Sequence, residues 1–284
     1  MTAHDSYRVL LGRIRMHVRD WQGAGPPVVF VHSFTANSLL ALRLGSLLSP
    51  RRRLIAPDLR GRGMSDAPAG EYGIPLHAQS VIDCLDRLQI DRFVVAGHSF
   101  GAAISLLLAE QLPARVTGLI LFDGGAPPAP EAARLLDAYY GSLRYRYPTA
   151  EAYIERFRAS PLYQPWTEEL DILTRSNLYQ QPDGTYIRQV ARYVVDAERR
   201  AESDALWAQL PELYAQVRCP VLIVRAGYGI TGKDDQVLPD ATLAAMLAAM
   251  PSAHAVTVEE AGHTSLMTIP HGGRDAAICA FLGI

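Results

Sequence analysis

The feature of this sequence that most clearly suggests chemistry is a serine between two glycines, Gly97-His98-Ser99-Phe100-Gly101. It follows an apolar run at residues 93–96 and precedes another at 102–107, a pattern that indicates a strand, one sharp corner and a helix. A serine on such a corner takes strained backbone angles, and the flanking glycines leave room where a Cβ would collide. The corner would present the Ser99 hydroxyl outside the sheet and leave the Phe100 N–H free to stabilise an oxyanion.

A serine hydroxyl is a poor nucleophile at neutral pH, so this corner requires a histidine base and a carboxylate that orients the histidine. With this motif the chain order is serine, then aspartate or glutamate, then histidine. His263, in the stretch Glu260-Ala261-Gly262-His263, comes directly after the last apolar run. A loop there would carry an imidazole to the same end of the sheet as Ser99, so His263 is the predicted base.

Three aspartates are candidates for the carboxylate. Asp234 and Asp235 lie in the stretch 232–239, and Asp123 ends the preceding predicted strand. An aspartate with a glycine three positions before it and a proline four positions after it fits a loop that leads into the next helix. This spacing selects Asp235 and leaves Asp234 as a solvated neighbour.

The elements that must position these groups alternate between strand and helix. Two short alternating segments within residues 7–21 predict a leading antiparallel pair, and continuous apolar runs after them predict strands buried on both faces. This alternation predicts an α/β fold with a mostly parallel, doubly wound sheet covered by helices on both faces. The predicted strands are 28–31, 54–57, 93–96, 119–122, 219–224 and 255–258, and the predicted helices are 38–48, 75–88, 101–111, 241–250 and 274–281.

A stretch rich in glycine and proline, residues 124–130, interrupts this alternation after the sixth predicted strand. From residue 131 to about 216 we expect helices broken by turns, one of them at Pro182-Asp183-Gly184, before the alternation resumes. The prediction is one core, residues 1–125 and 217–284, with a helical lid inserted at 126–216.

Most of the tyrosines lie in this predicted lid. Aromatic side chains with a polar tip suit the wall of a pocket that is apolar and partly wet. We expect Tyr139 and Trp166 from the lid, with Ser33 and His98 from the core, to line a substrate pocket.

Composition narrows the class of protein. Half of the residues are apolar and the net charge is −2, so there is no electrostatic case for a nucleic-acid or membrane partner. Cys84, Cys219 and Cys279 are too few and too scattered for a disulfide framework or a zinc site, which favours a reducing compartment. With no secretory or membrane-spanning pattern, we expect a cytoplasmic protein, a monomer or homodimer, whose partner is a small-molecule substrate.

Together these pieces resemble the α/β-hydrolase family from about residue 7 to the C-terminus. The resemblance implies a triad of Ser99, Asp235 and His263, an oxyanion hole made by the N–H groups of Phe34 and Phe100, and a lid formed by the insertion. The chemistry needs no metal or organic cofactor. The matching segments are Val31-His32-Ser33-Phe34, Asp58-Leu59-Arg60-Gly61-Arg62-Gly63-Met64-Ser65, residues 97–101, residues 232–239 and Gly262-His263.

One departure from that family lies in the oxyanion loop. Relatives usually have His-Gly where this sequence has His32-Ser33. The Ser33 side chain would narrow the loop or add a hydroxyl to the pocket. His32 and Arg60 are expected to brace these loops instead of acting on substrate.

The type of reaction follows in part from the residue on the corner. Relatives that open epoxides or displace halides need a carboxylate there, so Ser99 disfavours both reactions. Carbon–carbon hydrolases have His-Gly-x-Gly-x-Gly in the oxyanion loop and Asn before the serine, whereas this sequence has Ser33 and His98. We therefore expect cleavage of a carboxylic ester or lactone of a small, partly apolar substrate through an acyl-enzyme on Ser99. Carbon–carbon or amide hydrolysis with the same triad is the alternative.

Two rival functions remain. Gly227-Tyr228-Gly229-Ile230-Thr231-Gly232 matches G-x-G-x-x-G after a strand, but Lys233 and two aspartates follow where a nucleotide-binding motif opens a helix. The second rival is a non-catalytic small-molecule receptor on the hydrolase fold, because a fold does not determine a function.

Overall fold

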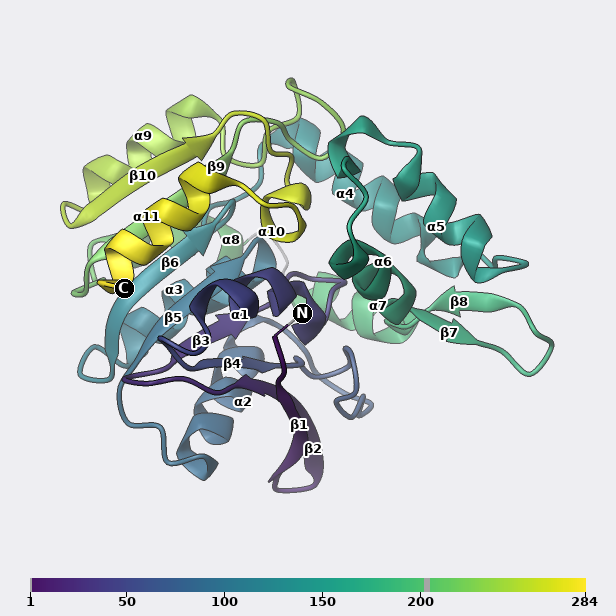
Figure 1. Ribbon diagram of the computed structural model, residues 1–284, viewed down its shortest axis with the longest axis horizontal. Coiled ribbons are helices and arrows are strands. Elements are labelled where there is room, and N and C mark those ends of the chain that lie inside the picture. The colour runs from purple at the N-terminus through teal and green to yellow at the C-terminus, as the bar shows by residue number, and fades with distance from the viewer. Residues whose placement is uncertain (1, 202–204) are drawn as a thin grey trace.

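The core of the molecule is an eight-stranded sheet with helices on both faces (Figure 1). The computed structural model describes residues 2–201 and 205–284. Across the sheet the strands run in the order β1-β2-β4-β3-β5-β6-β9-β10. Strand β2 is antiparallel to both of its neighbours, β1 and β4, and all pairs from β4 to β10 are parallel. The predicted doubly wound α/β sheet is confirmed. The strands are β1 (Asp5–Leu11), β2 (Ile14–Trp21), β3 (Val28–Val31), β4 (Leu54–Pro57), β5 (Phe93–His98), β6 (Val116–Phe122), β9 (Val221–Ala226) and β10 (Ala253–Val258).

Apolar side chains that alternate along the strands build two hydrophobic layers. In β5, Val95 joins the layer under one set of helices, while Val94 and Ala96 join the layer on the opposite face. Burial on both faces explains why these strands read as continuous apolar runs in the sequence. One face is covered by α2 (Ile74–Arg87), α3 (Phe100–Gln111), α8 (Ala205–Tyr214) and α9 (Asp240–Ala249), and the other by α1 (Leu42–Leu48), α10 (Ser265–Thr268) and α11 (Gly272–Leu282).

Between β6 and β9 the chain leaves the sheet and forms a layer of its own, drawn in teal and green in Figure 1. A β-hairpin interrupts the helices that we expected there, because Gly184 turns the chain at φ +83° and lets two short strands pair. The elements of this insertion are α4 (Pro130–Gly141), η2 (Ser142–Arg144), α5 (Ala150–Arg158), η3 (Pro161–Tyr163), α6 (Glu168–Ser176), β7 (Leu178–Gln180), β8 (Tyr186–Arg188) and α7 (Arg192–Ala201).

Helix α8 lies within the residues predicted as lid, yet it packs on α3 and α9 of the core. Leu210 and Tyr214 belong to the same apolar layer as the core helices. The Tyr214 hydroxyl also donates to the carbonyl of Gly125 at 2.8 Å. The part of the insertion that stands apart from the sheet therefore ends before α8.

The cysteines are all free: Cys84 and Cys219 are buried and Cys279 is partly exposed. Burial raises the pKa of Cys84 to about 12 and that of Cys219 to about 11, so neither thiol is a ready nucleophile. None of the helices in the described part of the chain has the length and apolar character needed to cross a bilayer.

Candidate active site

Ser99 sits on a strained corner between β5 and α3, as the glycine spacing predicted. Its backbone has φ +55° and ψ −116°, a left-handed region that a residue with a side chain rarely adopts. A Cβ on Gly97 would lie 2.1 Å from the carbonyl oxygen of Gly101, and a Cβ on Gly101 would lie 2.1 Å from that of Val31. Both positions therefore require glycine, and the corner projects Ser99 into the wall of a cavity.

The imidazole of His263 is held by Asp123. The Nδ1 atom of His263 lies 2.7 Å from Oδ2 of Asp123, and both side chains are buried. The other oxygen of Asp123 accepts the backbone N–H of Ala226, the last residue of β9, at 3.2 Å. With Nδ1 bound to the carboxylate, Nε2 of His263 is left for the cavity that His263 shares with Ser99.

The prediction that Asp235 orients the histidine does not match this geometry. The Asp235 carboxylate is occupied by its own loop: Oδ2 accepts the N–H of Thr231 at 2.6 Å and its hydroxyl at 2.8 Å, and Oδ1 accepts the N–H of Gly232 at 2.9 Å. A Gly-x-x-Asp spacing is typical of an aspartate that closes a tight turn as well as of a catalytic loop. The available signal for Asp123 was its place at the end of β6, the strand beside the one that ends at Ser99.

His98 holds the histidine loop through a backbone carbonyl. Its Nε2 lies 2.8 Å from the carbonyl oxygen of His263, and the two rings lie 4.6 Å apart. Burial, reinforced by the neighbouring His263, holds the pKa of His98 well below its usual value, so the ring is neutral and donates from Nε2. His98 thus positions His263 as well as lining the cavity.

The loop after β3 brings Phe34 opposite Phe100. Their rings meet edge to face with centroids 5.1 Å apart. Within the described part of the chain, the backbone N–H of neither residue donates to another protein group. Phe100 is the first residue of α3, where the N–H groups have no partner inside the helix. Both N–H groups are thus available to an oxyanion.

A buried ion pair supports this loop from the insertion. Arg62 donates from Nε to the carbonyl of Phe34 at 3.0 Å and from Nη1 to Glu198 of α7 at 2.6 Å. His77 of α2 lies 2.5 Å from the same Glu198 oxygen. Because the side chains of Arg62 and Glu198 are fully buried, loss of either would leave an uncompensated charge under the Phe34 loop.

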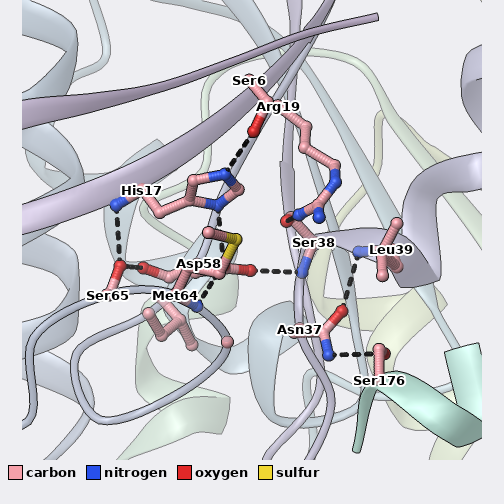
Figure 2. Close-up of polar contacts among 12 residues, drawn as sticks. Ser6, His17, Arg19, Asn37, Ser38, Leu39, Asp58, Met64, Ser65 and Ser176 are labelled. Atoms are coloured by element: carbon pink, nitrogen blue, oxygen red, sulfur yellow. Dashed lines mark hydrogen bonds and ion pairs between the residues drawn. The ribbon is translucent and has the colours of Figure 1, made fainter.

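A second polar network anchors the other end of this loop (Figure 2). Asp58, directly after β4, accepts the N–H of Ser38 at 2.6 Å and that of Met64 at 2.8 Å, and lies 2.7 Å from Nδ1 of His17. Burial tends to raise the pKa of Asp58, but these hydrogen bonds outweigh it and lower the pKa to about 2. Asn37 links the loop to α6, because its side-chain amide donates to the hydroxyl of Ser176 at 2.9 Å.

His32 braces the same region, as expected. Its Nδ1 lies 2.8 Å from the carbonyl of Ser33, and its Nε2 accepts the N–H of Leu59 at 2.9 Å. Burial lowers the pKa of His32 to about 4, so the ring is neutral in this bonding pattern.

The cavity between core and insertion has a volume of about 350 Å³. Of the four residues predicted to line it, Ser33, His98 and Tyr139 do so. Trp166 does not. The guanidinium carbon of Arg158 lies 5.1 Å from the centroid of the Trp166 ring, and the indole N–H donates to Oδ1 of Asp171 at 3.4 Å. An aromatic ring with a polar tip can either line a pocket or pack inside the insertion. The periodicity of the sequence does not distinguish these two placements.

The cavity has two positively charged side chains that sequence reasoning missed, Arg156 and Arg188, and the described lining residues include no aspartate or glutamate. Nor do the described residues contain a group of three His, Cys, Asp or Glu side chains placed to hold a metal ion. The other lining residues are Phe34, Thr35, Ala36, Leu40, Leu136, Tyr140, Ser142, Tyr147, Tyr153, Phe157, Ser160, Tyr163, Leu170, Leu173, Thr174, Asn177, Ile230, Thr231 and Thr264.

Two known proteins and one solved structure resemble this chain over more than half of its length. It is 30% identical to 2-(acetamidomethylene)succinate hydrolase of Mesorhizobium japonicum over 91% of this chain and 88% of that protein. It is 31% identical to 2-hydroxy-6-oxo-2,4-heptadienoate hydrolase of Pseudomonas putida over 60% of this chain and 71% of that protein. The crystal structure of E-2-(acetamidomethylene)succinate hydrolase superposes with a TM-score of 0.86 at 26% identity, covering 99% of this chain and all of the other.

The family model described as the alpha/beta hydrolase fold matches residues 26–270. This match spans the sheet from before β3 to beyond the histidine loop, and so includes the Ser99 corner, Asp123 and His263. The strand order, the serine corner and these comparisons agree: the chain belongs to the alpha/beta hydrolase family.

Proposed function

We propose that this hydrolase acts through a triad of Ser99, His263 and Asp123 and forms an acyl-enzyme on Ser99. The observation that carries the proposal is the 2.7 Å contact between Asp123 and His263, because it orients an imidazole in the cavity that Ser99 enters from its strained corner. In this arrangement Asp235 has a structural role in its own loop.

The first half-reaction begins when Nε2 of His263 removes the proton of the Ser99 hydroxyl. Asp123 holds the imidazole in the tautomer with the proton on Nδ1 and stabilises the imidazolium that forms. The Ser99 oxygen attacks the substrate carbonyl, and the N–H groups of Phe34 and Phe100 donate to the oxyanion. His263 then protonates the leaving group, and the acyl group stays on Ser99.

In the second half-reaction His263 removes a proton from water, which attacks the acyl carbonyl. The same two N–H groups stabilise the second tetrahedral intermediate. Collapse returns the proton to Ser99 and releases the acid, so the cycle consumes one water and no cofactor.

The first test is covalent labelling with a fluorophosphonate, which reports an activated serine without requiring knowledge of the substrate. We expect the native protein to be labelled and Ser99→Ala to remain unlabelled. His263→Ala should react far more slowly, because the base is gone. A folded native protein that is not labelled at Ser99 would favour the receptor function over the enzyme.

We propose that the cleaved bond is a carboxylic ester or lactone. The corner carries a serine and not a carboxylate nucleophile, and an acyl-enzyme mechanism gives a role to the triad and to both oxyanion donors. A series of p-nitrophenyl esters of increasing chain length, with lactones alongside, tests this substrate class. Turnover of an ester or lactone that is lost in Ser99→Ala is the expected result.

The relatives support a second candidate with the same triad. One is named for an acetamidomethylene compound, which contains an amide, and another for an oxo-heptadienoate, which has neither ester nor amide to hydrolyse. Amide or carbon–carbon hydrolysis is therefore the alternative. Assay of these two compounds beside the ester series decides between them by comparison of kcat/KM.

A further inference from the structure

Arg188, the last residue of β8, places a permanent positive charge in the wall of the cavity. Its side chain lines the same cavity as Ser99 and His263, yet the residue is only 4% exposed. A guanidinium remains protonated in proteins, so burial does not remove its charge. Taking such a charge out of water is costly unless a negative group compensates it.

No protein carboxylate compensates this charge in the described part of the chain. Four arginines are buried there, and three of them pair with an acid: Arg62 with Glu198, Arg225 with Asp240 and Arg274 with Asp275. Arg188 instead donates to the hydroxyl of Tyr139. Its guanidinium carbon also lies 4.9 Å from the centroid of the Tyr139 ring and 5.2 Å from that of Tyr153.

These aromatic contacts hold the guanidinium in place but leave its charge unpaired. Cation–π attraction is weaker than a charge-assisted hydrogen bond to an anion. A planar guanidinium with several N–H donors matches a carboxylate, which it can bind through two parallel hydrogen bonds. The described residues that line the cavity offer no acid of their own, so the matching anion would come from the ligand.

A hydrogen-bond chain connects this charge to the proposed reaction centre. Arg188 donates to the Tyr139 hydroxyl, which lies 3.2 Å from the hydroxyl of Thr35. Thr35 follows Phe34, whose N–H is the proposed oxyanion donor. A second arginine, Arg156, lines the cavity from a more exposed position and bonds the Tyr147 hydroxyl at 3.0 Å.

We propose that Arg188 binds a carboxylate of the substrate, so that the natural substrates of this site are organic acids whose cleaved bond reaches Ser99. This inference rests on the proposed function, since it names the substrate class of the same site. The two relatives described above are named for a succinate and a heptadienoate, both carboxylates.

A matched pair of substrates tests the proposal: the p-nitrophenyl monoester of adipic acid, which carries a free carboxylate, and the methyl ester of that compound, which is neutral. The measured quantity is kcat/KM for the acid divided by kcat/KM for the neutral ester. We expect the native protein to prefer the acid, and Arg188→Gln to lower the ratio by at least about tenfold. Arg188→Lys, which keeps the charge but loses the planar fork, should give an intermediate ratio.

Arg146→Gln is the matched control, because Arg146 pairs with Asp183 on the exposed hairpin and does not line the cavity. Its ratio should equal that of the native protein. A purely structural role for Arg188 would change stability and the rates on both esters together, and would leave their ratio unchanged. A ratio in folded Arg188→Gln or Arg188→Lys that equals the native one overturns the proposal.

Binding to Ser99→Ala separates this inference from the proposed reaction, since it needs no turnover. Calorimetric titration should show that succinate binds and that the neutral succinamide binds much more weakly. Adding Arg188→Gln should remove the difference. Equal binding of the two compounds, or no succinate binding in the millimolar range, counts against carboxylate recognition even if Ser99 is labelled by the fluorophosphonate.

Discussion

Nδ1 of His263 lies 2.7 Å from Oδ2 of Asp123, although 140 positions separate the two residues in the chain. His263 follows β10, which is separated from β6 by β9 in the sheet. The contact forms because these parallel strands end at the same edge and the loop after β10 reaches back over the end of β9, where the N–H of His263 donates to the carbonyl of Gly229 at 2.9 Å. Asp123 takes a positive φ of 43° and is followed by Gly124 and Gly125, which lets the chain turn directly beside Ser99.

Asp123→Asn should therefore lower kcat on a p-nitrophenyl ester by about 10²–10⁴-fold, because an amide cannot stabilise the imidazolium and favours the wrong tautomer. Asp235→Asn, the matched variant of the other acid, should retain kcat within about tenfold. Steady-state kinetics on both proteins measures the difference. A greater loss in Asp235→Asn than in Asp123→Asn would assign the acid to Asp235.

The serine corner should be intolerant of a single methyl group. In Gly97→Ala the new Cβ would lie 2.1 Å from a backbone oxygen, which forces the corner apart. We expect the free energy of unfolding to fall by about 3 kcal/mol and Ser99 labelling to slow. Gly141→Ala is the control, because its Cβ meets nothing within 4 Å at the end of α4. Urea denaturation of the two variants should show a loss in the first and none in the second.

The buried pair beneath the oxyanion loop should matter for both stability and rate. Glu198→Gln leaves the Arg62 charge uncompensated, and removal of one partner of a buried pair costs about 3–5 kcal/mol. Because Arg62 also donates to the Phe34 carbonyl, kcat should fall as well. Glu155→Gln removes an acid from an exposed pair with Arg158 and should leave both measurements unchanged. Equal unfolding free energies for the two variants would contradict this role.

Stability should fall as the pH decreases from about 6.5, the ordinary pKa of a histidine, toward 4. Burial lowers the pKa of four histidines: that of His32 falls to about 4, and those of His4, His77 and His98 also lie below the ordinary value. In this window the unfolded chain binds protons at these rings while the folded protein does not, so protonation favours unfolding. Each such proton contributes a slope of about 1.4 kcal/mol per pH unit. Unfolding free energies measured between pH 7 and pH 4 check the slope, and a flat profile would refute it.

The local sequence pattern was sufficient to predict those parts of the structure that depend on steric contacts between residues close together in the chain. The glycines at 97 and 101 define the Ser99 corner, because the backbone passes too close for a Cβ, and the buried apolar runs define the parallel sheet. His263 could be selected because the last strand of a parallel sheet delivers its loop to the same edge as Ser99. These features depend on neighbours in sequence and on one topological rule.

Contacts between segments far apart in the chain could not be predicted from the sequence and became visible only in the tertiary structure. Asp123 and Asp235 both follow strands that end at the same edge, and only the packing shows that Asp235 is occupied by Thr231 and Gly232. Arg188 looks like an ordinary residue at the end of a short strand until the hairpin places it among Tyr139 and Tyr153. The sequence by itself determined the fold and the strained corner at Ser99, because both follow from backbone geometry. The folded structure decided which acid orients His263 and where the unpaired charge lies, because side chains from separate elements compete for the same partners.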